Sequence, residues 1–213
     1  MKVLELFAGS RSIGKVAEQR GHEVFSVDIK DFEGIDLAKD IEHLTATDIP
    51  FAPDMVWASP PCTTYSMAAI SHHRNGQEAK TDFARKSDRL VIATLKLIKE
   101  LGCNFYIENP RGMLRKMDFM KGVERISVTY CSYGDTRMKP TDIWSNNIMS
   151  CFNPAGWWPL PMCKNGNPYC HHERAPRGSR TGTQGLKGNY ERSKIPEALC
   201  VEVIEAAERT YQL

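Results

Sequence analysis

Apolar and polar positions along the chain follow two different periods. Short apolar runs predict β-strands, and apolar residues three or four positions apart predict helices. The predicted strands span residues 2–8, 23–29, 54–58, 104–107, 126–133 and 142–148, and the predicted helices span residues 12–20, 85–101 and 196–211. This alternation is typical of an α/β fold with a mostly parallel sheet and helices on both faces. Such sheets bind ligands at the carboxyl ends of their strands.

Residues 149–195 break this rhythm, because Gly, Pro, Trp, Cys, His and Arg dominate there without a visible period. A segment of this kind is either a small stapled subdomain or a long functional loop. We therefore divide the chain into a core at 1–148, a small irregular insert at 149–190 and a segment at 191–213 whose helix returns to the core.

The composition is that of one globular domain, with 213 residues, 41% hydrophobic and 25% charged side chains. No apolar stretch approaches the roughly 20 residues that span a bilayer, and the start of the chain lacks the features of a secretory signal. We therefore expect no membrane partner and a cytoplasmic protein.

Charge is segregated along the chain. Residues 1–60 carry six Lys or Arg against eleven Asp or Glu, whereas residues 61–142 carry fourteen against nine and residues 143–195 carry seven against two. A basic middle of this kind suits a polyanion, because phosphate contacts dominate the affinity of proteins for nucleic acids.

A turn rich in small residues, Phe7-Ala8-Gly9-Ser10, follows the first predicted strand. Small residues let the backbone approach a ligand at a helix start, and Asp28 at the end of the next strand can accept hydrogen bonds from ribose hydroxyls. The turn outlines a nucleoside-cofactor pocket, although an ordinary strand-to-helix turn would use the same glycines. The three-glycine pattern of nicotinamide-binding proteins is incomplete here, which disfavours that cofactor.

Two further candidates follow later strands. Ser59-Pro60-Pro61-Cys62 ends the third strand, where a rigid turn beside a helix start favours the Cys62 thiolate and a nucleophile over a buried structural cysteine. Glu108-Asn109-Pro110 follows the strand at 104–107. In a parallel sheet both groups reach one edge, so Cys62 and Glu108 would offer a nucleophile and an acid to one substrate. The alternative for Glu108 is a solvated loop carboxylate.

In this order the motifs resemble those of the cytosine-C5 DNA methyltransferases, in a short, phage-like or mobile-element-like form. The cofactor, nucleophile and acid motifs of that family are similar to Leu6-Phe7-Ala8-Gly9-Ser10, Pro60-Pro61-Cys62 and Glu108-Asn109-Pro110. Weaker similarities lie in Asp28, in Asp40-Ile41, in Tyr133-Gly134 with Arg137 and Lys139, and in residues 192–196.

The resemblance implies a Rossmann-like, S-adenosylmethionine-dependent methyltransferase fold and a DNA substrate. Cys62 would add to carbon 6 of cytosine, Glu108 would hold N3 and the exocyclic amine, and the target base would be flipped out of the duplex. The other implied catalytic residues are Arg137 and Lys139. The expected cofactor-binding residues are Leu6, Phe7, Ala8, Gly9, Ser10, Asp28, Ile29, Asp40, Ile41 and Pro60. The expected DNA-binding residues are Ser66, Arg74, Arg85, Arg177 and Arg180.

The sequence departs from the family in its basic motif, where Arg137, Lys139 and Thr141 replace Gln, Arg and Arg. Ser10 and Ser12 stand where glycines are usual, and the target-recognition region of the family is far longer than the insert. Three alternatives therefore stay open: the same chemistry on single-stranded DNA or a free cytosine nucleotide, a donor that is an analogue of S-adenosylmethionine, and a catalytically silent DNA-binding relative. No oligomeric state is predicted.

The insert also carries Cys151, Cys163, Cys170 and His172, which offer four metal ligands of the Cys3His type. A segment with so few aliphatic residues needs a staple to stay ordered, which favours a structural zinc ion. The spacings of 11 and 6 intervening residues differ from those of a short CxxC knuckle, and the alternative is a set of free thiols and exposed histidines.

Overall fold

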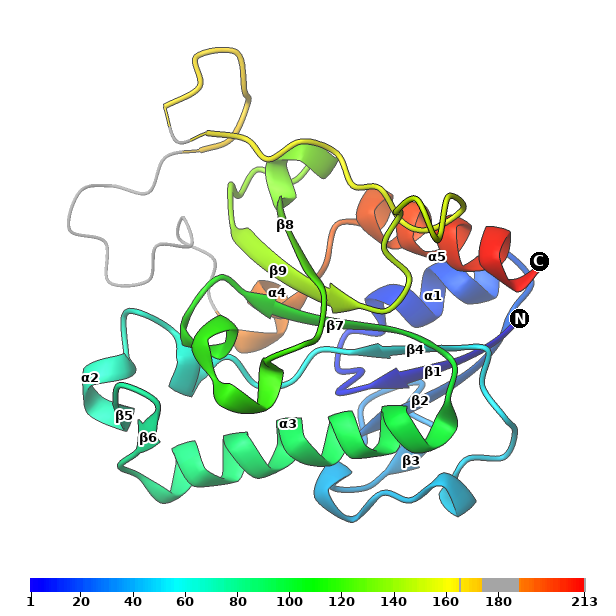
Figure 1. The fold of residues 1–213 in the computed structure, drawn as a ribbon, viewed down its shortest axis with the longest axis horizontal. Helices are drawn as coiled ribbons and strands as arrows, with labels where there is room; N and C mark the ends of the chain where they lie inside the picture. Colours follow the sequence, from blue (N-terminus) through cyan, green and yellow to red (C-terminus); the bar gives the residue numbers. More distant parts are fainter. Residues whose placement is uncertain (165, 174–187, 213) are drawn as a thin grey trace.

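The computed structural model describes residues 1–164, 166–173 and 188–212. Its centre is a seven-stranded sheet with the strand order β3-β2-β1-β4-β7-β9-β8 (Figure 1). The first five strands in this order are parallel, whereas β9 is antiparallel to both of its neighbours. The strands are β1 (Lys2–Leu6), β2 (Glu23–Asp28), β3 (Leu37–Ala38), β4 (Met55–Ala58), β7 (Asn104–Pro110), β8 (Arg125–Thr129) and β9 (Pro140–Ser145). The predicted mostly parallel sheet is confirmed.

Helices cover both faces of the sheet, as predicted. Helices α1 (Ser12–Gln19) and α5 (Glu197–Tyr211) pack together on one face, and the long helix α3 (Asp82–Leu101) lies on the other (Figure 1). The short elements are α2 (Ile70–His73), β5 (Arg74–Asn75), β6 (Glu78–Ala79), α4 (Asn189–Ser193) and six 3-10 turns: η1 (Ile41–His43), η2 (Ala46–Asp48), η3 (Thr63–Tyr65), η4 (Met113–Lys116), η5 (Asp118–Met120) and η6 (Tyr130–Tyr133). None of the described helices is long and apolar enough to cross a membrane.

Local chemistry explains where the elements differ from their predicted bounds. Helix α3 begins three residues early, because the Thr81 hydroxyl accepts a hydrogen bond from the Ala84 N–H at 3.2 Å and caps the helix. Strand β8 stops at Thr129, four residues before the predicted end. The chain turns there into η6, and Gly134 with φ 84° closes that turn.

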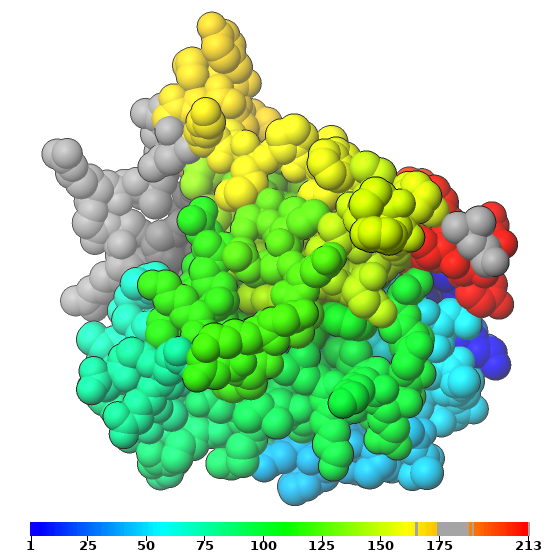
Figure 2. Space-filling model, in the orientation of Figure 1, coloured from blue at the N-terminus to red at the C-terminus, as the bar shows by residue number. Residues whose placement is uncertain are grey.

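Two apolar clusters fill the spaces on the two faces of the sheet. One packs Trp57 and Tyr106 against α1 and α5, and the other packs Ile107 and Trp144 against α3. Trp157 belongs to the first cluster although it lies in the predicted insert, and its indole N–H donates to Glu202 Oε1 at 2.8 Å. The beginning of the insert is therefore packed onto the core, while the chain near residue 170 projects from the surface (Figure 2).

Candidate active site

The ends of three neighbouring parallel strands form one edge of the sheet. Strand β1 pairs with β4 and β4 pairs with β7, with Leu6 beside Ala58 and Ala58 beside Ile107. The residues that follow these strands therefore meet, as the sequence predicts. They open onto a cavity of about 620 Å³ that contains both Cys62 and Glu108. The predicted site residues that line this cavity are Phe7, Ala8, Ser10, Pro60, Cys62, Ser66, Glu108 and Lys139.

Cys62 lies in a turn that the neighbouring strand braces. The side-chain amide of Asn109 donates to the Pro60 carbonyl at 2.8 Å, which ties the turn after β4 to the end of β7. The Cys62 carbonyl then accepts the Tyr65 N–H at 3.1 Å and starts η3. Two motifs 46 residues apart are thus joined directly behind the thiol.

Burial raises the pKa of the Cys62 thiol, and the negative charge of Glu108 raises it further, while Lys139 acts in the opposite direction. The expectation that the turn favours the thiolate is therefore wrong. The rigid turn positions the sulfur, but the apolar surroundings and the nearby carboxylate favour the neutral thiol.

Glu108 is buried and anchored at one oxygen. The Tyr130 hydroxyl donates to Glu108 Oε1 at 2.9 Å, and Lys139 Nζ lies 4.0 Å from the same oxygen. Lys139 also lies over the Tyr130 ring at 4.4 Å. The phenol has its pKa raised well above its usual value by burial and by Glu108, so it remains a hydrogen-bond donor. The sequence analysis missed Tyr130, because no pattern along the chain links it to Glu108.

Arg137 does not line the cavity, unlike Lys139. Its guanidinium is buried against Asp135 and also donates to the carbonyls of Arg192 and Lys194 at 3.3 and 3.1 Å. Its pKa is raised, mainly by the hydrogen bond to Asp135. In this structure Arg137 therefore holds the segment at residues 192–194 against the core, in place of the substrate contact that the resemblance implies.

The loop after β1 has the open backbone expected of a cofactor turn. Phe7, Gly9 and Arg11 all have left-handed φ angles, of 56°, 45° and 54°. Asp28 Oδ2 accepts the Gly9 N–H at 3.1 Å, which fixes the loop to the end of β2. Ile29 is 65% exposed beside it and free of the core.

Leu6, Asp40 and Ile41, which are also predicted cofactor residues, are not among the residues that line the cavity. Leu6 and Ile41 are buried in the core, and Asp40 caps η1 while it pairs with Lys86 on α3. The pKa of Asp40 is lowered, since hydrogen bonds from Lys86 and the Glu42 N–H outweigh partial burial.

Glu5 is a buried cavity residue that the sequence analysis missed. Its oxygens accept the Ile13 N–H at 3.1 Å and the Ser26 hydroxyl at 3.2 Å, and burial raises its pKa to about 7. Gly14 is required beside it, because a Cβ there would lie 2.6 Å from Glu5 Oε2. A single charged residue in the apolar run Val3-Leu4-Glu5-Leu6 was the available signal.

The predicted DNA-binding residues have different environments. Ser66 lines the cavity and Arg85 is exposed on α3, where it pairs with Asp82. Arg74 is buried, so the prediction that it contacts DNA is wrong. It donates to the Thr64 carbonyl at 2.9 Å and pairs with Asp88 at 2.7 Å, which holds η3 behind Cys62. Arg177 and Arg180 lie outside the described residues.

Three of the four predicted metal ligands come together, and the fourth is replaced. Cys163, Cys170 and His172 form a group with Cys131 of η6, with all four ligand atoms within 4.8 Å of one another. Cys151 is exposed and is not part of this group. Cys131 takes the place predicted for Cys151, because the fold, and not the spacing within the insert, brings Cys131 to the other three ligands.

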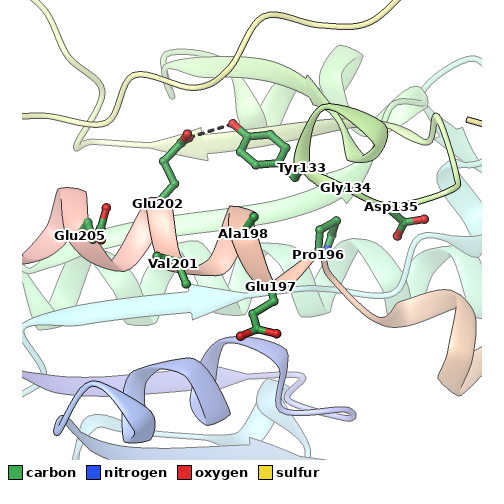
Figure 3. Close-up of a pocket in the computed structure, with 9 residues that line it drawn as sticks. All are labelled: Tyr133, Gly134, Asp135, Pro196, Glu197, Ala198, Val201, Glu202 and Glu205. Carbon is green, nitrogen blue, oxygen red and sulfur yellow. Dashed lines mark hydrogen bonds between the residues drawn. The ribbon is translucent and has the colours of Figure 1, made fainter. Parts of the chain in front are cut away.

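A second cavity, of about 740 Å³, lies between η6 and α5 (Figure 3). Its lining includes four carboxylates, and the Tyr133 hydroxyl donates to one of them, Glu202 Oε1, at 2.8 Å. The described lining of this second cavity holds none of the predicted catalytic or cofactor residues.

Residues 1–127 match the protein family described as C-5 cytosine-specific DNA methylase. The chain belongs to this family. The match contains the cofactor turn, Cys62 and Glu108, so the resemblance drawn from these motifs is confirmed.

Full-length similarity exists to a protein of Frog virus 3 (isolate Goorha) named "Probable DNA (cytosine-5)-methyltransferase". The two are 29% identical over 218 residues, which cover 96% of this chain and 99% of the viral one. Among solved structures, the Entamoeba histolytica methyltransferase EhMeth has a TM-score of 0.53 at 14% identity, over 70% of this chain and 55% of its own. The S. pombe Dnmt2 methyltransferase has a TM-score of 0.48 at 14% identity, over 68% and 48%. This C-5 methylase spans about half the length of the solved structures that it matches.

Proposed function

We propose that the chain transfers a methyl group from S-adenosylmethionine to carbon 5 of cytosine in DNA through a covalent adduct on Cys62. The observation that carries this proposal is the meeting of Cys62 and Glu108 in one cavity that also reaches the loop after β1. A silent DNA-binding relative would not need a thiol and a buried carboxylate facing one space.

The cavity fits the cofactor in size and in backbone shape. A volume of about 620 Å³ lies within the range of roughly 300–1,000 Å³ usual for small-molecule sites. Phe7, Ala8, Ser10 and Pro60 line the cavity and would hold the cofactor beside the loop with left-handed φ angles. When bound, S-adenosylmethionine supplies an electrophilic methyl group on its sulfonium.

Cys62 would activate the pyrimidine, because carbon 5 of cytosine is a poor nucleophile by itself. A bond from Sγ to carbon 6 makes carbon 5 enamine-like and able to take the methyl group. The carbon 5 proton then leaves to solvent, and the bond between sulfur and carbon 6 breaks to regenerate the enzyme.

Glu108 would bind N3 and the exocyclic amine of the base. This contact would also remove one cause of the raised pKa of Cys62. In the free site the charge of Glu108 opposes ionisation of the thiol. Once Glu108 shares a proton with N3, its charge no longer opposes ionisation of the Cys62 thiol. The proton that leaves Sγ balances the proton that the N3–Glu108 pair gains. Lys139 and the Tyr130 hydroxyl would hold Glu108 in place during this step.

A cytosine stacked in a duplex cannot reach this cavity, so the target base would be flipped out. The stretch after Cys62 supplies part of the cavity wall through Ser66, Ala68 and Ala69. Met67, which lies between Ser66 and Ala68 in the sequence, is 68% exposed and is not a lining residue.

The test is methyl transfer from labelled S-adenosylmethionine to duplex DNA, single-stranded DNA and dCMP. We expect activity on DNA that is abolished in Cys62→Ala and severely reduced in Glu108→Gln, with cofactor binding retained in both. Cys103→Ser is the matched control, because Cys103 is a partly buried thiol that does not line the cavity. Equal activity of Cys62→Ala and wild type would refute the proposal, and a preference for dCMP would replace DNA with a nucleotide substrate.

A further inference from the structure

Four metal-binding side chains from two separate parts of the chain converge beside the end of β8. Cys131 belongs to η6 in the core, whereas Cys163, Cys170 and His172 belong to the insert. Their ligand atoms all lie within 4.8 Å of one another, and Cys163 Sγ is 3.7 Å from His172 Nδ1. A tetrahedral zinc ion with bonds of about 2.3 Å to sulfur and 2.0 Å to nitrogen separates such atoms by about 3.6 Å.

We propose that Cys131, Cys163, Cys170 and His172 bind one structural zinc ion. Three thiolates and one imidazole make a closed set of four ligands, which is the composition of structural zinc sites and leaves no position open for a substrate. None of the four residues lines the cavity that holds Cys62. The site is thus separate from the methyl-transfer chemistry and does not depend on the proposed function.

Hydrogen bonds from backbone and side-chain groups hold the ligand frame in place. The Cys163 N–H donates to Thr129 Oγ1 at 2.8 Å, and the Ser132 hydroxyl donates to the Pro161 carbonyl at 2.9 Å. At the other end, the Glu173 N–H donates to the Thr136 carbonyl at 2.8 Å. The side-chain amide of Asn167 approaches Cys163 Sγ at 3.7 Å, as a donor that would support a thiolate. The convergence is therefore built into the fold on both sides of η6.

The insert beyond Trp157 needs such a staple, because it buries almost nothing. Among the described residues of 158–173 only His172 is buried, and Tyr169 is 96% exposed. A segment of this length without an apolar core is ordered by a metal or by disulfides. The cysteines of the group are free thiols and so are available as metal ligands.

The position of Cys131 extends the role of the metal toward the active site. Cys131 directly follows Tyr130, whose hydroxyl donates to Glu108. A zinc ion at Cys131 would therefore fix both the insert and the turn that carries this phenol.

The first test measures metal content in the full chain, purified by gel filtration without chelator, by mass spectrometry of the elements. We expect one zinc per chain in wild type and less than one fifth of that in Cys170→Ser and His172→Ala. Cys151→Ser and Cys103→Ser are matched controls and should keep one zinc, because neither cysteine is in the group. Loss of zinc in Cys151→Ser, with retention in Cys170→Ser, would overturn the proposed ligand set.

The second test avoids variants that fold poorly. Wild type exchanged with Co²⁺ should show the visible absorption of tetrahedral thiolate cobalt, and the three thiols should react with an alkylating reagent only after chelation. Metal-free protein with reactive thiols and an unchanged melting temperature, or a disulfide within the group, would overturn the zinc site. A full equivalent of zinc in a protein without methyltransferase activity would support the zinc site and contradict only the proposed function.

Discussion

Tyr130→Phe isolates the contact that holds Glu108 in position. The substitution removes one hydroxyl, keeps the buried ring, and takes away the hydrogen bond to Glu108 Oε1 at 2.9 Å. Lys139 remains at 4.0 Å from that oxygen, beyond hydrogen-bonding distance. We expect slower methyl transfer, because Glu108 would be less firmly oriented toward the base.

The expected size follows from the charge of the acceptor. A hydrogen bond to a charged group contributes about 1.5–3 kcal/mol, and each 1.36 kcal/mol changes a rate tenfold. If the contact acts in the transition state, kcat falls roughly 10- to 100-fold, nearer the lower figure while Lys139 still attracts the carboxylate. The KM for S-adenosylmethionine should stay within about twofold, since Tyr130 does not line the cavity.

Tyr133→Phe is the control for this prediction. Tyr133 is also buried and also donates to a carboxylate, Glu202 Oε1 at 2.8 Å, but beside the second cavity (Figure 3). Both variants should show a similar decrease in melting temperature, about 2–4 °C for each kcal/mol of lost unfolding free energy. Single-turnover methyl transfer is then compared for both. Equal rates in Tyr130→Phe and wild type, or equal losses in both variants, would refute the positioning role.

Three further predictions concern stability. Arg74→Ala should lower the free energy of unfolding, measured in urea, by about 3–5 kcal/mol, because it removes the buried partner of Asp88. The control Arg85→Ala, at an exposed residue, should change this free energy by less than about 0.5 kcal/mol. Similar values for the two variants would contradict the buried role of Arg74. The pKa of Glu5 is about 7 in the folded state, whereas the unfolded chain releases this proton near pH 4.5. Protonated Glu5 therefore contributes fully to the free energy of unfolding below pH 4.5, and about 3 kcal/mol of this contribution is lost as the pH rises through 7. Urea titrations should show that Glu5→Gln flattens this decline, and an unchanged slope would count against it. Gly14→Ala should cost about 1–3 kcal/mol of unfolding free energy and weaken cofactor binding, because its Cβ would meet Glu5; calorimetry that finds neither effect would be inconsistent with the 2.6 Å approach.

The order of elements could be predicted from the sequence, because strands β1, β2, β4 and β7 are apolar runs ended by glycine, proline or polar residues. The meeting of Cys62 and Glu108 could also be predicted, since parallel strands bring their carboxyl ends to one edge. The short strand β3 was missed, because two residues carry no period.

Contacts between distant segments could not be predicted. Nothing along the chain shows that Arg74 turns inward to Asp88, or that Cys131 replaces Cys151 beside Cys163, because both depend on how the turns fold onto the core. The pKa of Cys62 is a further case. Local sequence favours a thiolate at a helix start, whereas burial and a carboxylate from another strand raise the pKa.

The most direct measurement is mass spectrometry of the protein after incubation with S-adenosylmethionine and DNA that contains 5-fluorocytosine. Fluorine at carbon 5 prevents loss of the proton that normally precedes release, so the bond between sulfur and carbon 6 persists. We predict a covalent complex with DNA in wild type and in Cys103→Ser, mapped by peptide sequencing to Cys62, and none in Cys62→Ala. A complex that forms in Cys62→Ala, or that maps to another cysteine, would contradict the role of Cys62.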